Sequence, residues 1–164
     1  MIFVTVGTHE QPFNRLIEYM DNLKRNKLID ESIVIQTGYS TYTPQYCTWD
    51  KYYSYQQMIQ NVNEARIVIT HGGPSSFIMP LQIGKIPIVV PRQKQFGEHI
   101  NDHQVNFTRE VAKRTGSIIV VSDIELLGKT INNYPEIIKH MTKNSISNNV
   151  KFNEELKRIV SDLF

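Results

Sequence analysis

The chain has 164 residues, of which 40% are hydrophobic and 21% charged, a mixture typical of one folded domain and unlike a disordered chain. Its net charge is only +2 and its lysines and arginines are scattered, which argues against nucleic-acid binding. Its one cysteine, Cys47, excludes an internal disulfide and fits a reducing compartment. No apolar run approaches the roughly 20 residues of a membrane span, and the first residues resemble a strand rather than a signal peptide. We therefore expect a single cytoplasmic domain, residues 1–164.

Short β-branched runs alternate along the chain with amphipathic stretches. Strands are predicted where an apolar run ends at a glycine, proline or polar turn, in residues 2–6, 33–37, 66–70, 86–90 and 117–121. Helices are predicted where apolar residues recur at helical spacing, in residues 12–26, 55–63, 76–83, 101–114, 123–133 and 148–164. Residues 39–55 are rich in Tyr, Thr and Pro and predict a loop with one short strand.

The alternation of strands and helices indicates the fold class. It predicts right-handed βαβ units and a parallel sheet with helices on both faces, a Rossmann-like α/β fold. Such sheets bind ligands beyond the carboxyl ends of their strands. The glycine-rich and polar segments of this chain all follow predicted strands, in residues 7–9, 37–38, 71–76 and 91–104. They can therefore converge on one ligand.

The most informative segment consists of His71, Gly72, Gly73, Pro74, Ser75 and Ser76. Its glycines allow a sharp turn and a close approach of the backbone to a ligand, and its proline suits the first turn of a helix. The serine hydroxyls add donors at a helix N-terminus, whose dipole favours an anion. These features predict a diphosphate cradle, although a structural turn before a capped helix explains them equally well. The segment lacks the spacing of a Walker loop and of the dinucleotide G-x-G-x-x-G motif.

A second polar segment covers residues 91–104 and opens the next predicted helix. Its last residues offer carboxylate, imidazole and amide groups to sugar hydroxyls: Asp102, His103 and Gln104. The alternative role of Asn101 or Asp102 is that of a helix cap. His99 and His103 have the four-residue spacing of some metal ligands, but no third ligand has matching spacing, so we expect no metal.

Two further groups of residues are candidates for the same site or for an interface. His9 and Glu10 follow the first strand and are candidate acid–base groups, while a solvated loop or a cap before Pro12 is the alternative. Trp49 lies among six tyrosines at positions 39, 42, 46, 52, 53 and 55. This cluster predicts a stacking platform, a packed loop or a protein interface, where Tyr and Trp are enriched.

Several of these motifs, in this order, resemble the glycosyltransferase family 28 C-terminal domain. The matching segments are Gly7-Thr8 with Pro12-Phe13, residues 70–76, residues 84–87 and Asp102-His103-Gln104. In particular, the chain resembles over about residues 1–138 the short PssE-like subunits of bacterial capsule and exopolysaccharide synthesis. These are similar to the catalytic subunit of the eukaryotic two-subunit enzyme that adds the second N-acetylglucosamine to dolichol.

The resemblance implies half of a GT-B fold that binds a UDP-sugar without a cofactor or an obligatory metal. The other half would be a separate membrane-anchored subunit, which holds this chain at the inner face of the plasma membrane and binds a polyprenyl-diphosphate-linked acceptor. The reaction would be inverting transfer of a hexose, galactose or N-acetylglucosamine, with a helix N-terminus stabilising the departing UDP. The tail, residues 148–164, is the candidate docking element for this partner.

The resemblance also implies roles for individual residues. Gly7 and Thr8 would line the phosphate side, and residues 73–76 would bind the diphosphate. Residues around Arg92 would meet the uracil. The donor sugar would be met by Asp102 and Gln104.

One position departs from the family pattern. Met79 stands where many relatives have a ribose-binding glutamate, and Pro80 follows it inside a predicted helix, so ribose recognition is expected to differ. The base for the acceptor hydroxyl would belong to the missing half, or else be His9 or Glu98. Two other functions stay open: a non-catalytic nucleotide-sugar-binding module that regulates a transferase, which Met79 favours, and a flavodoxin-like domain for another phosphate ligand such as FMN.

Overall fold

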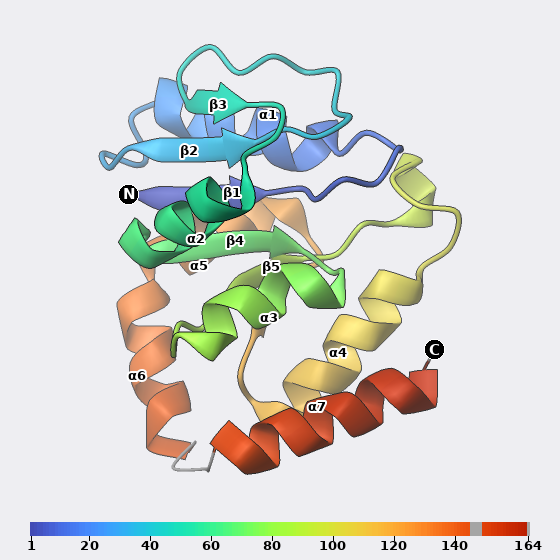
Figure 1. Ribbon diagram of the computed structural model, residues 1–164. Helices are drawn as coiled ribbons and strands as arrows, with labels where there is room; N and C mark the ends of the chain where they lie inside the picture. The colour runs from blue at the N-terminus through green and yellow to red at the C-terminus, as the bar shows by residue number, and fades with distance from the viewer. Residues whose placement is uncertain (145–148, 164) are drawn as a thin grey trace.

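The computed structural model describes residues 1–144 and 149–163 and contains one six-stranded parallel sheet between layers of helices (Figure 1). The strands are β1 (Ile2–Thr5), β2 (Ile33–Gln36), β3 (Thr48–Asp50), β4 (Ile67–His71), β5 (Ile88–Val90) and β6 (Ile119–Val120). Their order in the sheet is β3-β2-β1-β4-β5-β6, which is that of the doubly wound dinucleotide-binding fold. The predicted Rossmann-like α/β class is confirmed.

The α-helices are α1 (Asn14–Arg25), α2 (Tyr55–Glu64), α3 (Pro74–Gln82), α4 (His103–Thr115), α5 (Leu127–Asn132), α6 (Tyr134–Asn144) and α7 (Asn149–Leu163). Two short 3-10 helices, η1 (Lys94–Phe96) and η2 (Ile124–Leu126), precede α4 and α5. Most of these elements lie where the sequence predicts them, and the short strand expected within residues 39–55 is β3. The helix predicted at 123–133 is divided into η2 and α5, and α6 has no counterpart in the prediction.

Side-chain alternation along the strands divides the core between the two faces of the sheet. One face packs against α1 and α5 through Ile2, Val4, Ile33, Ile35, Ile67, Ile69, Ile88 and Val90. The other face packs against α2, α3 and α4 through Phe3, Val34, Val68 and Val89. Burial on both faces explains why these strands appear in the sequence as continuous apolar runs.

Helix α7 packs against α4, which it crosses in Figure 1. Leu156 and Ile159 are buried in a cluster with Phe107 and Val111 of α4. The apolar face that could have served a partner is thus used, at these positions, within the chain. Other parts of the predicted docking tail lie outside the described residues and side chains: Asn148, Phe152, Leu163 and Phe164. No helix within residues 1–144 and 149–163 has the length and apolar character needed to cross a membrane.

The long loop between β2 and β3 is anchored to α1 by one buried carboxylate. Asp21 is 1% exposed and accepts hydrogen bonds from the backbone N–H groups of Gln45, Tyr46 and Cys47 and from the hydroxyl of Tyr42. These four donors replace the water that the carboxylate loses on burial. Asp21 therefore fixes the path by which the chain reaches the edge strand β3.

Asp21→Asn is expected to remove an acid-sensitive part of the stability. Burial raises the pKa of Asp21, but hydrogen bonds from Gln45, Tyr46 and Tyr42 outweigh it and hold the pKa below 3.8. A lowered pKa stabilises the fold above the unfolded-state value, and this stability is lost as the pH falls through the folded-state value. Urea unfolding should show the wild-type chain more stable than the variant by about 1–3 kcal/mol at pH 7. This gap should shrink as the pH falls below 3.8; a pH-independent gap would contradict the assignment.

Candidate functional site

The carboxyl ends of β1 and β4 open a crevice in the middle of the sheet. The two strands are paired neighbours, and the chain leaves them toward opposite sides of the sheet. Such a switch point is where doubly wound folds bind ligands. The loop after β1 contains Gly7, and the loop after β4 contains Gly72 and Gly73. The loop after β1 touches the end of β4, because a Cβ on Gly7 would overlap the ring of His71, the last residue of that strand.

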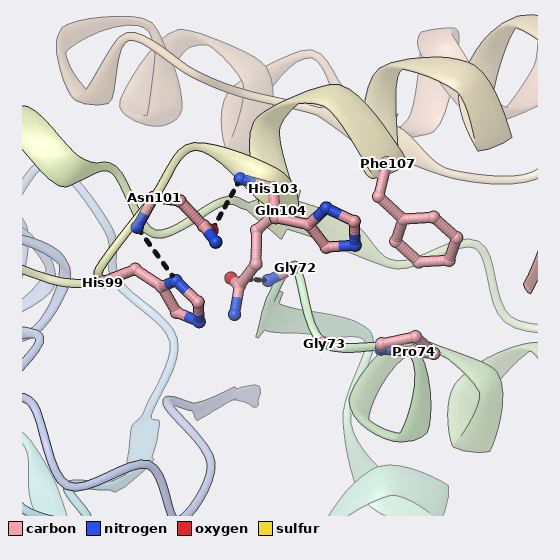
Figure 2. A pocket seen from close by; sticks show the side chains of 8 residues that line it. All are labelled: Gly72, Gly73, Pro74, His99, Asn101, His103, Gln104 and Phe107. Atoms are coloured by element: carbon pink, nitrogen blue, oxygen red, sulfur yellow. Dashed lines mark hydrogen bonds between the residues drawn. The ribbon is translucent and has the colours of Figure 1, made fainter. Parts of the chain in front are cut away.

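Two cavities flank the turn formed by Gly72 and Gly73. The first, which we call the α2–α3 cavity, has a volume of about 540 Å³ and lies between the loop after β1 and helices α2 and α3. The second, the α4 cavity, has a volume of about 360 Å³ and lies between the turn and the start of α4 (Figure 2). Ser75 and Ser76 line the first cavity and Pro74 lines the second. The N-terminus of α3 therefore separates the two.

His71 holds the loops on both sides of the crevice together. Its side chain is buried, its Nδ1 accepts a hydrogen bond from the backbone N–H of Gly73 at 3.0 Å, and its Nε2 lies 2.5 Å from Oγ of Ser76. Burial, followed by the nearby charge of Arg92, lowers the pKa of His71 to about 3, so the ring is neutral at pH 7. A Cβ on Gly7 or Gly73 would overlap this ring. The ring therefore accounts for the glycine at both positions.

Gln104 connects α4 to the same turn. Its Oε1 accepts hydrogen bonds from the backbone N–H groups of Gly72 at 2.9 Å and Arg92 at 3.1 Å. The oxygen is thus held by two donors, and the amide NH₂ remains as a donor on a side chain that lines the α4 cavity (Figure 2). A Cβ on Gly72 would lie only 2.9 Å from Cβ of Gln104, which explains the second glycine of the pair. Gln104 thus holds the turn and lines the α4 cavity, and its predicted contact with a sugar stays a prediction.

The other polar residues near the start of α4 divide into capping and lining groups. Oδ1 of Asn101 accepts a hydrogen bond from the backbone N–H of His103, and Oδ1 of Asp102 accepts one from that of Lys94. Asp102 therefore supports the preceding loop and does not line the α4 cavity, while His103 does. His99 precedes α4, so it shares no helix face with His103. Within the described residues, no three His, Cys, Asp or Glu side chains are grouped as metal ligands.

Arg92 is part of the scaffold and is not presented to a ligand. It is 1% exposed, and its guanidinium donates to the carbonyls of Val6, Gln11 and Glu98 at 2.8, 2.7 and 3.1 Å. Burial lowers its pKa to about 10, so it stays charged at pH 7. The family resemblance implies that residues around Arg92 meet the uracil, but the guanidinium of Arg92 itself donates to backbone carbonyls on both sides of the loop after β1.

Glu98 is likewise engaged within the protein. It is 3% exposed, and its carboxylate accepts two hydrogen bonds from the guanidinium of Arg15, at 2.7 and 2.9 Å, and one from the backbone N–H of Gln93. A base needs a lone pair that reaches the proton it removes. This placement favours a structural role for Glu98 over the catalytic role that the sequence suggests.

His9 lies at the mouth of the crevice beside a second imidazole. Its ring centroid is 4.9 Å from that of His99, and its Nδ1 lies 3.2 Å from the backbone N–H of Gln11. Burial, and then the charges of Arg92 and His99, lower the pKa of His9 and favour the neutral ring. With Nδ1 accepting, the proton is on Nε2. His9 lines the α2–α3 cavity, and in the neutral ring its one lone pair is taken by the N–H of Gln11.

The polar floor of the α2–α3 cavity is not predicted from the sequence. Thr5 and Gln36 lie side by side on β1 and β2, and the Thr5 hydroxyl donates to Oε1 of Gln36 at 2.5 Å. The walls include two of the predicted tyrosines and three apolar side chains: Tyr53, Tyr55, Met58, Val62 and Met79. The signal in the sequence was the polar residue, Thr5 or Gln36, that ends each of these two otherwise apolar strands.

The strand order and the crevice at the switch point define a domain of the doubly wound α/β class. Residues 1–163 match the model of the glycosyltransferase family 28 C-terminal domain, and the chain belongs to this family. The resemblance inferred from the sequence motifs is thereby confirmed at the level of the family.

Two solved structures share this fold, which matches that of GT-B glycosyltransferases. The crystal structure of the glycotransferase of kitacinnamycin has 16% sequence identity and a TM-score of 0.57, over 96% of this chain and 39% of that chain. The glycosyltransferase SnogD from Streptomyces nogalater has 17% identity and a TM-score of 0.50, over 73% of this chain and 30% of that chain. This chain thus spans less than half of either protein. Among curated proteins, none matches it.

Proposed function

We propose that this chain is the donor-binding part of an inverting glycosyltransferase and binds a UDP-sugar across the Gly72–Gly73 turn. The observation that carries the proposal is the pair of cavities that meet at the N-terminus of α3, at the switch point of the sheet. The nucleoside, the diphosphate and the sugar of such a donor follow one another in the same order as the α2–α3 cavity, the N-terminus of α3 and the α4 cavity. The family and the fold of the similar structures support this class of ligand.

Each part of the donor fits a different portion of the site. The apolar walls and polar floor of the α2–α3 cavity suit a nucleoside, since small-molecule sites combine apolar walls with a few polar groups. The diphosphate would lie at the N-terminus of α3, where Ser75, Ser76 and Thr8 add donors to a favourable helix dipole. The sugar would occupy the α4 cavity, with its hydroxyls accepting hydrogen bonds from the amide of Gln104.

The proposed reaction forms one bond and breaks another at the anomeric carbon. The acceptor hydroxyl oxygen attacks this carbon, the bond from the carbon to the diphosphate oxygen breaks, and UDP leaves with the electron pair. The N-terminus of α3 stabilises the charge that develops on the leaving group. The hydroxyl proton must pass to a base, but the carboxylate of Glu98 is held by Arg15 and Nδ1 of His9 by Gln11. We therefore assign the base to the acceptor-binding part.

The acceptor-binding part is proposed to be a separate membrane-anchored subunit that holds this chain at the inner face of the plasma membrane. From the PssE-like resemblance, the acceptor is a polyprenyl-diphosphate-linked sugar and the product a precursor of a surface polysaccharide. The transferred hexose is galactose or N-acetylglucosamine, and neither a cofactor nor a metal takes part.

Calorimetric titration of the chain with UDP, without added metal, tests the donor site. We expect binding of UDP in preference to ADP and FMN. In the Ser75→Ala/Ser76→Ala variant, UDP affinity should fall about tenfold or more, because hydrogen bonds to charged groups are lost. Ser117→Ala/Ser122→Ala, away from both cavities, is the matched control and should bind normally. Binding of FMN but not of UDP would identify a flavodoxin-like domain instead.

A second candidate is a non-catalytic nucleotide-sugar-binding module that regulates a transferase. Met79 favours it, because this apolar side chain lines the α2–α3 cavity where a ribose-binding carboxylate would be expected. Release of UDP from labelled UDP-sugar separates the two candidates, measured with the chain and its membrane-anchored partner together. Catalysis requires release that depends on both proteins and is reduced in the Gln104→Ala variant. Binding without such release would support the regulatory module.

A further inference from the structure

The imidazole of His71 and the hydroxyl of Ser76 form a pair whose direction is set by the backbone. Nδ1 of His71 lies 3.0 Å from the N–H of Gly73, which can only donate, so Nδ1 must accept. The pKa of His71, lowered by burial and then by Arg92, leaves one proton on the ring, which must be on Nε2. Nε2 is 2.5 Å from Oγ of Ser76, so the ring donates to this oxygen.

The direction of this hydrogen bond determines where the proton of the Ser76 hydroxyl points. Because its oxygen accepts from Nε2–H of His71, its own proton points away from the ring and is available to another acceptor. Ser76 lies in the first turn of α3 and lines the α2–α3 cavity beside Ser75 and Thr8. We propose that His71 is a positioning residue that fixes Ser76 as a hydrogen-bond donor to an ionised phosphate. This inference rests on the proposed binding of a nucleoside diphosphate. It explains how a hydroxyl fixed as a donor favours the ionised form of the phosphate.

The geometry shows why this direction is firmly fixed. The ring of His71 lies between Gly7 and Gly73, where a Cβ from either side would overlap it. It therefore cannot rotate without displacing the loops after β1 and β4. A chain of donors from Nε2–H through the hydroxyl to the phosphate also polarises along its length, which strengthens the last hydrogen bond as charge grows on the leaving group. No proton is transferred in this arrangement.

A direct measurement on the wild-type chain tests the tautomer without any ligand. Two-dimensional proton–nitrogen NMR of the imidazoles should show His71 protonated at Nε2 and not at Nδ1, with no titration between pH 5 and pH 8. A ring protonated at Nδ1, or one that titrates in this range, would overturn the inference whatever the chain binds.

Two substitutions of His71 separate positioning from structure. Asn places an acceptor near the position of Nδ1 but does not reach Ser76, whereas Gln can place an N–H near the position of Nε2. We expect His71→Asn and Ser76→Ala each to weaken UDP binding about tenfold, and the double variant to be no weaker than Ser76→Ala alone. His71→Gln should recover most of the affinity. Losses that add in the double variant, or a Gln variant as weak as Asn, would refute the pair.

The same series is repeated with inorganic pyrophosphate as the probe. If the wild-type chain binds pyrophosphate but not UDP, the proposed donor is wrong while the pair can still be judged from the pyrophosphate affinities of its variants. If the wild-type chain binds neither, the assignment of Ser76 as a phosphate donor is overturned. Circular dichroism of each variant shows whether a lost affinity reflects a lost fold.

Discussion

Replacing Arg92 with methionine is expected to lower the free energy of unfolding by about 3 kcal/mol or more, because buried carbonyls are left without donors. The guanidinium donates to three backbone carbonyls, those of Val6, Gln11 and Glu98. Methionine fills a similar volume but leaves these acceptors unpaired in a dry interior, at about 1–3 kcal/mol each. Urea unfolding at pH 7 followed by circular dichroism gives the difference.

Two further variants show which property of Arg92 matters. Arg92→Lys keeps the charge but not the planar fork, so it should recover only part of the stability. Arg109→Met removes an exposed arginine of α4 and should change the stability by less than about 0.5 kcal/mol. If Arg92→Met is within about 1 kcal/mol of the wild-type chain, the carbonyls must find other donors and the scaffold role is wrong.

Arg92 and Glu98 also show where reading the sequence reaches its limit. Both lie in a polar segment after β5; the family resemblance made Arg92 a candidate for uracil binding, and Glu98 was a candidate for the base if the missing half does not supply it. Their partners are far away in the chain, since Arg92 is 86 residues from Val6 and Glu98 is 83 residues from Arg15. No local periodicity encodes such a pairing. Only the fold shows that these two charged side chains bind other parts of the protein and hold the loops of the site in place.

The sheet itself was predictable for the opposite reason. Strands buried on both faces need continuous apolar runs, and each run here ends where the chain turns, as at Gly7 after β1. The position of the candidate site was predictable in the same way, because the carboxyl ends of parallel strands lie at one edge of the sheet and the polar segments follow those ends. Helix α6 follows α5 after only one residue, Asn133, so little in the sequence marked it as a separate helix.

Gly73→Ala is expected to weaken UDP binding about a hundredfold, although it adds a single methyl group. Gly73 has φ −74° and ψ 133°, which any residue adopts, so the backbone carries no strain in the variant. The whole effect comes from the Cβ, which would overlap the His71 ring. To make room, the ring must leave its position between the glycines and lose its contacts with the N–H of Gly73 and the hydroxyl of Ser76. Calorimetric titration with UDP measures the loss.

Gly128→Ala is the matched control for this change. Gly128 lies in α5, away from both cavities, and a Cβ there would meet first Cδ2 of Leu23 at 3.3 Å, the flexible end of a side chain. Its UDP affinity should equal that of the wild-type chain. In the His71→Ala background, adding Gly73→Ala should cost no further thermal stability, because the ring that the Cβ would strike is gone. A Gly73→Ala chain that binds UDP normally would show that the ring can move freely. The claim that His71 holds the two loops together would then be wrong.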